Sequence, residues 1–456
     1  MHPDLGLFMG RHSTLNSYLL MILQLVCGRV LVPGGNIVPG MVMPMGFHAD
    51  ERDEKTWRTV ATNMPPAAAG AFPPAVLPEE ILTDHPERIR AVYVSACNPL
   101  RSYPDTTAYE TAFGNLDLLV VNEIVMSETA RLAHYVLPAC SFYESDDVTF
   151  FPMSYPGVYL QLRRPILSPP GECRELAHIF TDIADKLGII PEIPDELHQA
   201  AACDRLTFGA GLMEWAGTEP CALAAMPFVL AKTLGRQWGS PHLAALWGLL
   251  MTAPKALYKN AVRAGFDPGP DLGDRLFQAV IDNPQGLWVG KADNPMAAVK
   301  TDSGKIEAHI PELAEAVQAL DAATEGDAPK MPAEFPLVLN AGRHMKYNIN
   351  TLMRTPEWNK GKRACTVAVS PEDADRLRLA DGQTVRVTTS AGSETGELEV
   401  NDQVRPGMVL IPHGFGLIYD DSVYGINVNR LTRNTHRDPL TVTPLHRFVP
   451  CRVKAA

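Results

Sequence analysis

Three short apolar runs between Ala91 and Glu144, each ending in a polar loop, constrain the fold of this chain most strongly. Two segments of helical length separate the runs. Pro104–Phe113 has proline in its first turn, and Ser127–Ala133 opens with a serine suited to cap a helix. Strands that alternate with helical segments pair in parallel and carry helices on their faces. The runs and their loops are Ala91–Ala96 with Cys97–Arg101, Leu118–Val121 with Asn122 and Glu123, and Tyr135–Leu137 with Pro138–Ser141.

The polar loops form a candidate ligand site, because ligands of parallel sheets bind at the carboxyl ends of the strands. Asn98 and Pro99 follow the first strand, and Asn122 and Glu123 follow the second. The Asn-Pro pair could also be an ordinary turn. A carboxylate in the place of Glu123 commonly accepts hydrogen bonds from ribose or guanine. We therefore predict a nucleotide-type site without a phosphate-binding loop or a GxGxxG signature.

From Phe335 onward the pattern is that of short strands. Apolar residues recur with a period of two in Thr384–Thr388 and Gly396–Val400. Ser370 is placed to cap a short helix that ends at Leu379. Short strands with one small helix predict a closed β-barrel. Further barrel strands are expected at Pro336–Leu339, Thr366–Val369 and Met408–Ile411.

Hydrogen-bond donors are dense directly after the first barrel strand. An arginine fork and a lysine suit phosphate groups, and the neighbouring side chains add further donors. Isolated His or Asn residues after later strands are weaker candidates, because such residues are more often structural. The first group is Arg343, His344, Lys346, Tyr347 and Asn348, and the second is His413, Gly414 and Asn429.

The remaining segments set the expected domain division. An amphipathic helix is expected at Leu176–Leu187, with Gly188 as its stop. Beyond it, the apolar stretch Trp238–Tyr258 is expected to form part of a packed core. Thr301–Glu307 resembles a turn that enters a strand. Glu312–Lys330 has the composition of a linker. The expected parts are an α/β domain at residues 1–190, an irregular or helical connecting region at 191–330 and a barrel at 331–456.

Composition excludes several classes of function. Forty Lys and Arg against 52 Asp and Glu give a net charge of −12, which argues against a nucleic-acid partner. The eight cysteines show neither zinc nor iron–sulfur spacing. The sequence contains no apolar run long enough to span a membrane and no signal peptide, so a cytoplasmic protein is expected.

The N-terminal helix suggests an incomplete domain. Its apolar positions run from Leu15 to Val26, Ser13 or Thr14 can cap it, and Gly28 ends it. Few residues precede this helix, so we expect the α/β domain to lack its beginning.

Four stretches occur in the order in which one enzyme family carries its motifs. They are Cys27–Asn36 with its Gly-Gly turn, the strands and loops from Ala91 to Glu144, Thr301–Glu307, and Val369–Gly414 followed by Asp438-Pro439 and Pro444. In these stretches the chain resembles the molybdopterin oxidoreductases of the dimethyl-sulfoxide-reductase superfamily. The resemblance covers nearly the whole chain.

The resemblance implies a fold and a cofactor. The expected fold is a partial, doubly wound α/β dinucleotide-binding domain followed by a double-psi-type β-barrel. The expected cofactor is a pair of molybdopterin guanine dinucleotides that carry molybdenum or tungsten and perform the redox chemistry. Asn98, Pro99, Asn122 and Glu123 would then hold a guanosine arm, whereas the donors at 343–348 with His413, Gly414 and Asn429 would face the pterins and phosphates. No catalytic residue or metal ligand is identified in the chain.

The resemblance extends only to the family's C-terminal portion. The iron–sulfur cysteines and the metal-ligating segment of the family would precede Met1. We therefore expect an oxidoreductase that is inactive without an N-terminal molybdopterin and iron–sulfur half or subunit, with a possible electron-transfer subunit beside it. Formate dehydrogenases of this family carry an arginine after the Gly-Gly turn, and its absence from Asn36–Gly46 argues against formate as substrate.

Two alternatives stay open. The chain could be a catalytically silent scaffold of the same fold inside an electron-transfer complex. It could also be a family member with non-redox chemistry, such as hydration.

Overall fold

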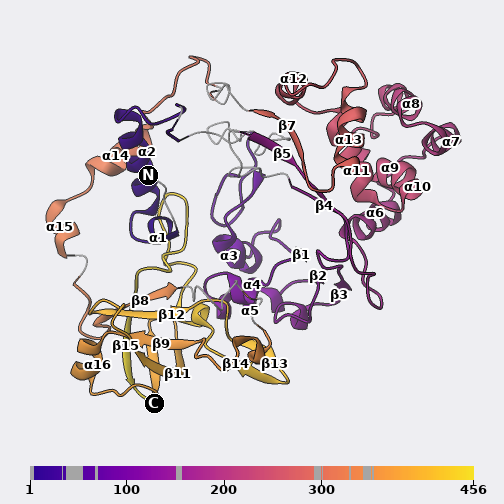
Figure 1. Ribbon diagram of the computed structural model, residues 1–456. Helices are drawn as coiled ribbons and strands as arrows, with labels where there is room; N and C mark the ends of the chain where they lie inside the picture. Colours follow the sequence, from indigo (N-terminus) through magenta and orange to yellow (C-terminus); the bar gives the residue numbers. More distant parts are fainter. Residues whose placement is uncertain are drawn as a thin grey trace. The chain divides into compact units, whose positions relative to one another are not determined.

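The computed structural model describes residues 5–32, 34–36, 55–66, 70–149, 157–291, 299, 301–327, 330–342, 351 and 354–456. The chain divides into two compact units. The first combines Met1–Val30, Phe47–Leu137 and Thr301–Ala456, and the second combines Leu31–Gly46 with Pro138–Lys300. Figure 1 labels most of the helices and strands of both units. The three-part division expected from the sequence stays a prediction.

The first unit contains a three-stranded sheet in the order β1–β2–β3. β1 (Ala91–Ser95) and β2 (Leu118–Glu123) pair in parallel, with Ser95 opposite Asn122. β3 (Tyr135–Pro138) is the neighbour of β2 on its other side. The parallel pairing expected for the first two apolar runs is confirmed. The helices of this region are α3 (Leu77–Leu82), α4 (Pro99–Ser102) and α5 (Thr106–Gly114).

Apolar packing against α5 fixes β2 in place. Leu119 of β2 is fully buried in one cluster with Tyr109 and Phe113 of α5. The two aromatic rings meet edge to face with centroids 5.5 Å apart, a favoured geometry for buried aromatic pairs. The helix begins two residues later than expected, because the Asp105 side chain accepts a hydrogen bond from Ala108 N–H at 3.1 Å and caps it.

The prediction of a helix over Ser127–Ala133 is wrong in its length. Only a 3₁₀ turn forms, at Ala130–Leu132. The Ser127 hydroxyl accepts from Ala130 N–H at 3.3 Å, as a helix cap would. Glu128 and Thr129, however, form long-range hydrogen bonds to other parts of the first unit, and these hold the segment away from a regular helix.

The expected N-terminal helix is present as α2 (Ser13–Val26), which follows the short helix α1 (Leu5–Phe8). The predicted cap is wrong, since His12 occupies the N-cap position and donates no cap hydrogen bond. Instead, Ser13 and Thr14 donate to the carboxylate of Asp438, with Thr14 Oγ1 2.7 Å from Oδ1. A carboxylate at a helix N-terminus complements the helix dipole, so a distant residue replaces the local cap.

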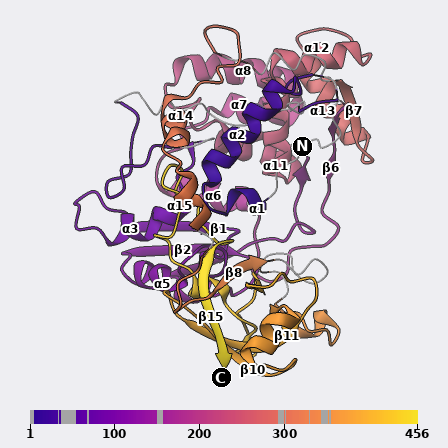
Figure 2. The same ribbon diagram turned by 90° about the vertical axis from the view of Figure 1, so that its left-hand side faces the viewer.

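The expected closed barrel is confirmed. Six strands follow the order β10–β11–β9–β12–β8–β15, and β15 also pairs with β10 to close the ring. β15 leads to the C-terminus (Figure 2). A cluster of buried aliphatic side chains from all six strands fills the interior. The strands are β8 (Leu337–Gly342), β9 (Thr366–Val369), β10 (Thr384–Thr389), β11 (Ser393–Val400), β12 (Met408–Pro412) and β15 (Val449–Ala455).

Two short elements accompany the barrel. α16 (Pro371–Leu377) begins after Ser370, whose hydroxyl accepts from Asp373 N–H at 3.0 Å, as predicted. A hairpin of β13 (Leu417–Tyr419) and β14 (Ser422–Tyr424) follows β12 and pairs outside the barrel ring. This hairpin is absent from the sequence-based expectation.

Residues 301–327 differ from the prediction. Thr301–Glu307 does not enter a strand, because Thr301 Oγ1 donates to Lys305 O at 2.7 Å and closes a turn. The expected linker contains α14 (Pro311–Gln318) and α15 (Ala322–Asp327). Ala and Glu favour helix, and proline suits the first helical position. α14 packs against α2, which gives it a tertiary partner.

The second unit is mainly helical, with the antiparallel pairs β4–β6 and β5–β7. The predicted helix at Leu176–Leu187 is confirmed as α6, and Gly188 follows it with φ +67°. Trp247 is buried and donates from Nε1 to Asp274 Oδ1 at 2.8 Å, so the apolar stretch at Trp238–Tyr258 does contribute to the core. Among the described residues, no helix is long and apolar enough to cross a bilayer.

The elements of the second unit are β4 (Asp147–Val148), β5 (Gly157–Leu160), β6 (Leu162–Arg163), α6 (Leu176–Lys186), α7 (Asp195–Cys203), α8 (Arg205–Thr218), α9 (Met226–Leu230), α10 (Arg236–Trp238), α11 (Pro241–Met251), α12 (Lys255–Arg263), α13 (Leu272–Asp282) and β7 (Leu287–Lys291).

Gly416, before the β13–β14 hairpin, provides a test of the packing around the barrel. It has φ +75°, and a Cβ there would lie 2.8 Å from the backbone N of Asn427. Gly407 has φ +84° with open space around the same position. A side chain at positive φ costs roughly 1–2 kcal/mol, and overlap with backbone adds about 1–3 kcal/mol. We predict that Gly416→Ala lowers the free energy of unfolding in urea more than Gly407→Ala does. Equal losses of unfolding free energy in the two variants would contradict the close approach of Asn427 to Gly416.

Candidate functional site

A buried carboxylate joins the strand-end loops to the barrel hairpin inside the first unit. Glu128 lies in the loop after β2, and its side chain is 3% exposed. Arg354 forms a fork on it, with Nη1 2.7 Å from Oε1 and Nη2 3.1 Å from Oε2. Ile418 N–H of β13 donates to Oε1 and Asn98 Nδ2 donates to Oε2, both at 2.7 Å. A bidentate arginine with two further donors satisfies the buried charge.

These hydrogen bonds control the protonation of Glu128. Burial by itself raises the pKa of this carboxyl, but the donors from Arg354, Ile418 and Asn98 outweigh burial and lower the pKa to about 2. The carboxyl is therefore ionised at neutral pH, and the ion pair with Arg354 is intact.

A second set of contacts ties the same parts of the first unit together. Arg101 of α4 is buried and donates from Nε to Gly416 O at 2.6 Å. Asn429 Nδ2 donates to Arg101 O at 2.8 Å, and Asn427 Nδ2 donates to Thr106 Oγ1 at 3.0 Å. These bonds hold the loops that follow β12 and β14 against α4 and α5.

Asn98 and Asn429, both predicted to contact a ligand, are occupied by protein contacts. Asn98 is 4% exposed, and besides its bond to Glu128 its Oδ1 accepts from Thr129 Oγ1 at 2.8 Å. Asn429 is 2% exposed and binds Arg101 as described above. Pro99 takes the first position of α4 and is buried. A ligand role for these three residues stays a prediction, and the contacts seen position the loops.

Asn122 and Glu123 end β2 and leave acceptors available. Asn122 Nδ2 donates to Leu137 O at 2.9 Å, whereas its buried Oδ1 has no hydrogen-bond partner in the described part of the chain. Glu123 Oε1 accepts from Ile124 N–H at 2.8 Å. Burial raises the pKa of Glu123, and that N–H and the charge of Arg354 offset only part of the rise. An unpaired buried acceptor costs about 1–3 kcal/mol, so a donor-bearing ligand would be stabilising here.

His413 and Gly414, two of the predicted barrel site residues, lie where β12 ends beside the end of β8. β8 and β12 pair in parallel, with Pro412 opposite Gly342, and His413 N–H donates to Gly342 O at 2.9 Å. Gly414 follows with φ +88°. The donor cluster of Arg343, His344, Lys346, Tyr347 and Asn348 continues from β8 but lies outside the described residues.

His446 belongs to the same barrel end. Its carbonyl accepts from Ala341 N–H at 2.9 Å, which places it beside β8. Burial lowers the pKa of His446 to about 4, helped by the charges of His413 and Arg447, so the ring is neutral at neutral pH. Within the described ranges, its Nε2 is buried without a hydrogen-bond partner. This is a second polar atom that a bound group could satisfy.

Sequence reasoning missed Glu128, Arg354 and His446. Glu128 and Arg354 lie 226 positions apart, and although Glu128 falls within the stretch Ala91–Glu144 that resembles the family, nothing in that stretch singled it out. The only available signal for Glu128 was a carboxylate in a strand-end loop beside a capping serine. For His446 the only signal was its place just before the last strand.

The fold and site define a class of protein in which an α/β strand-end site and a closed barrel share one compact unit. Residues 17–186 match the model of the molybdopterin oxidoreductases, and residues 337–450 match that of the molydopterin dinucleotide binding domain. The chain therefore carries a molybdopterin oxidoreductase domain followed by a molydopterin dinucleotide binding domain of the same enzyme family. The dinucleotide-binding domain supports a molybdopterin cofactor with molybdenum or tungsten.

Individual relatives agree with this family. A trimethylamine-N-oxide reductase of Haemophilus influenzae is 24% identical over 96% of this chain, and the α subunit of an F420-dependent formate dehydrogenase of Methanocaldococcus jannaschii is 23% identical over 74%. The fold is similar to that of acetylene hydratase from Pelobacter acetylenicus, with a TM-score of 0.55 and 18% identity over 86% of this chain. The chain spans 51%, 40% and 47% of these three proteins, respectively.

The low pKa of Glu128 predicts a specific acid sensitivity. Because this pKa lies below the ordinary value of 4.5, the ion pair contributes full stability above about pH 4.5 and loses it as the pH falls toward 2. Glu128→Gln should lower the free energy of unfolding at pH 7 by roughly 3–5 kcal/mol, since it leaves Arg354 without a buried partner. The difference in unfolding free energy between this variant and the unsubstituted protein should be smaller at pH 3 than at pH 7.

The matched control is Glu315→Gln on α14, an exposed site where urea unfolding should change by less than about 0.5 kcal/mol at either pH. A Glu128→Gln loss that stays constant between pH 7 and pH 3 would contradict the assigned ion pair.

Proposed function

We propose that the first unit holds the dinucleotide portion of molybdopterin guanine dinucleotide and that the chain acts within a molybdenum or tungsten oxidoreductase. The observation that carries this proposal is that, among the described residues, Asn122 Oδ1 and His446 Nε2 are buried without a hydrogen-bond partner. One lies at a strand end of the sheet and the other at the end of the barrel. Both elements belong to the same compact unit.

The polar groups at the two ends suit different parts of this cofactor. Asn122 Oδ1 and the free oxygen of Glu123 are acceptors, which a guanine amino group or ribose hydroxyls would satisfy. The barrel end supplies the neutral ring of His446. Arg343 and Lys346 follow β8 in the sequence, and side chains of these types suit pterin amides and phosphates. The available residues therefore fit the group.

The contribution of the protein is to position and shield the cofactor. When bound, the metal with its pterins supplies the redox chemistry, whereas protein groups supply orientation and electrostatics. Glu128 fixes the loop that follows the acceptors of β2, and Arg101 fixes the loop after β12. Two cofactors per enzyme, as expected from the sequence, are part of the proposal.

We also propose that another part of the family fold covers the three-stranded sheet. Sheets built with parallel pairing are normally covered on both faces. Here Tyr93 of β1, Leu118 of β2 and Tyr135 of β3 are 36%, 38% and 64% exposed, and Val125 and Met126 beside them are also exposed. Exposed apolar residues on neighbouring strands mark interaction surfaces. The proposed partner is the N-terminal molybdopterin and iron–sulfur half or subunit, with an electron-transfer subunit as a further partner.

Two other functions are separable by experiment. A silent scaffold would hold no pterin in the assembled complex. A hydratase-type enzyme, the activity named for the structural neighbour, would hold the cofactor but would not reduce or oxidise substrate with an electron-carrying dye.

Arg343 offers a direct test of cofactor binding. Arg343→Ala should lower the pterin content of the enzyme reconstituted with its partner, because the substitution removes a forked donor for phosphate. Arg405→Ala, at an exposed turn before β12, is the matched control and should leave the pterin content unchanged. Pterin is measured by fluorescence after oxidation. The assignment fails if Arg343→Ala retains the full amount.

The partner proposal has its own test. The chain produced alone should aggregate readily and hold less than stoichiometric molybdenum or tungsten, because the sheet face and apolar side chains of α2 such as Leu23 and Val26 are exposed. Co-production with an N-terminal half should restore solubility, metal content and dye-linked turnover. Elemental analysis of both preparations is the measurement, and near-stoichiometric metal in the lone chain would show that no partner is needed.

A further inference from the structure

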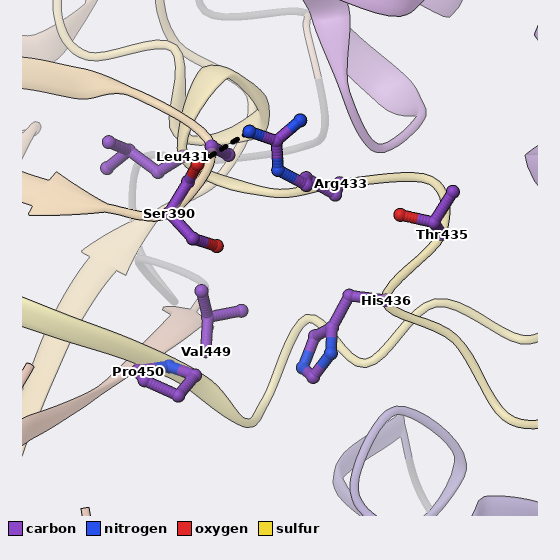
Figure 3. Close-up of a pocket in the computed structure, with 8 residues that line it drawn as sticks. Ser390, Leu431, Arg433, Thr435, His436, Val449 and Pro450 are labelled. Carbon is purple, nitrogen blue, oxygen red and sulfur yellow. Dashed lines mark hydrogen bonds between the residues drawn. The ribbon is translucent and has the colours of Figure 1, made fainter. Parts of the chain in front are cut away.

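A polar pocket lies at the rim of the barrel, between the β10–β11 turn, the start of β15 and the loop after residues 428–431. It has a volume of 260 Å³. Figure 3 shows Arg433 and Ser390 at one side of the hollow, with Thr435, His436, Val449 and Pro450 around the rest. The residues that line it are Ser390, Ala391, Leu431, Arg433, Thr435, His436, Val449 and Pro450. None of them belongs to the proposed cofactor site.

A hydrogen bond fixes Arg433 at this pocket. Its Nη2 donates to the carbonyl of Ser390 at 2.6 Å, the contact drawn in Figure 3. A guanidinium has five N–H donors, so this bond leaves most of them available. The residue is exposed, and within the described ranges it has no acidic partner. The arginine is therefore oriented by the backbone but not neutralised.

Of the other polar groups of the pocket, the two hydroxyls can donate to a ligand, whereas the N–H of His436 is already used. His436 forms a 2.7 Å hydrogen bond from Nε2 to Phe448 O. A carbonyl only accepts, so Nε2 carries the proton and the ring has a fixed tautomer. The hydroxyls of Ser390 and Thr435 have no hydrogen-bond partner in the part of the chain that the structure describes. A hydroxyl rotates to donate to whatever acceptor enters.

The charge of the pocket lining differs from that of the chain as a whole. The whole chain has a net charge of −12, yet no acidic side chain lines the pocket. Buried Leu431 and Val449 form apolar walls. Apolar walls lower the local dielectric and strengthen the attraction between the guanidinium and an anion. A volume of 260 Å³ accommodates a small anion and excludes a dinucleotide.

We infer that this pocket binds a small tetrahedral oxyanion, with phosphate or a small phosphate ester as the chemical class. Arg433 provides a charged fork, and Ser390 and Thr435 provide neutral donors to the remaining oxygens. None of its lining residues is among those proposed to hold the dinucleotide. It therefore goes beyond the proposed function.

The test is calorimetric titration of the full chain, co-produced with a partner if needed, with inorganic phosphate. Arg433→Gln should weaken phosphate binding at least tenfold, and Arg433→Lys, which keeps the charge but loses the fork, should weaken it about threefold to tenfold. Thr435→Val removes one exposed hydroxyl and should weaken it about threefold. Arg386→Gln is the matched control, because Arg386 is an exposed arginine on β10 outside the pocket.

Three results would overturn the inference. The first is no phosphate binding at millimolar concentration. The second is equal weakening by Arg386→Gln and Arg433→Gln, which would indicate general charge attraction. The third is displacement of phosphate by guanosine diphosphate with unchanged stoichiometry, which would assign the pocket to the dinucleotide. Thr435→Val, an exposed loop change, keeps the inference testable should Arg433→Gln fail to fold.

Discussion

The buried ion pair of Glu128 with Arg354 is the interaction on which the arrangement of the first unit depends. A carboxylate that is 3% exposed is stable only when its charge is compensated, and here four hydrogen bonds compensate it. The donors come from the loop after β1, from Arg354 and from β13. Satisfying one charge thus determines where three separate segments of chain must lie. The proposed cofactor site depends on that placement, because Asn122 and Glu123 stand in the adjacent loop.

In the first unit, two packed apolar cores hold the strands, and the candidate site lies on the loops at the strand ends. The barrel interior and the cluster around β2 are packed with aliphatic and aromatic side chains, and neither offers polar groups to a ligand. Among the described residues of this unit, the buried atoms without a hydrogen-bond partner include Asn122 Oδ1 and His446 Nε2, which lie beside strand ends. Glu128 anchors the loop that follows Asn122, and the hydrogen bond from Ala341 N–H holds the backbone of His446 beside β8, so a ligand would meet a largely preformed site.

Local pattern predicted much of this fold. Period-two alternation identified the barrel strands, and alternating apolar runs and helical segments identified β1 and β2, because both signals arise within a few residues. The expected strand at Thr301–Glu307 and the linker at Glu312–Lys330 were wrong, since a side-chain turn and packing of α14 against α2 decided those structures. The cap of α2 was missed for a similar reason, as Asp438 lies more than 400 positions away.

The candidate site was less predictable than the fold. Strand-end loops could be located from the sequence, but which side chains face outward could not. Asn98 and Asn429 have the residue type of ligand contacts, yet both are used to hold loops together. The pairing of Glu128 with Arg354 depends on the completed tertiary structure and leaves no local pattern.

The most direct test of the central claim is hydrogen–deuterium exchange of the assembled enzyme with and without molybdopterin guanine dinucleotide. The account predicts that cofactor binding slows amide exchange in residues 122–129, at the end of β2, and in residues 411–418, at the barrel end. Both segments should be protected together, because Glu128 and Ile418 link them. Protection confined to the helical second unit, with neither segment of the first unit affected, would contradict the account.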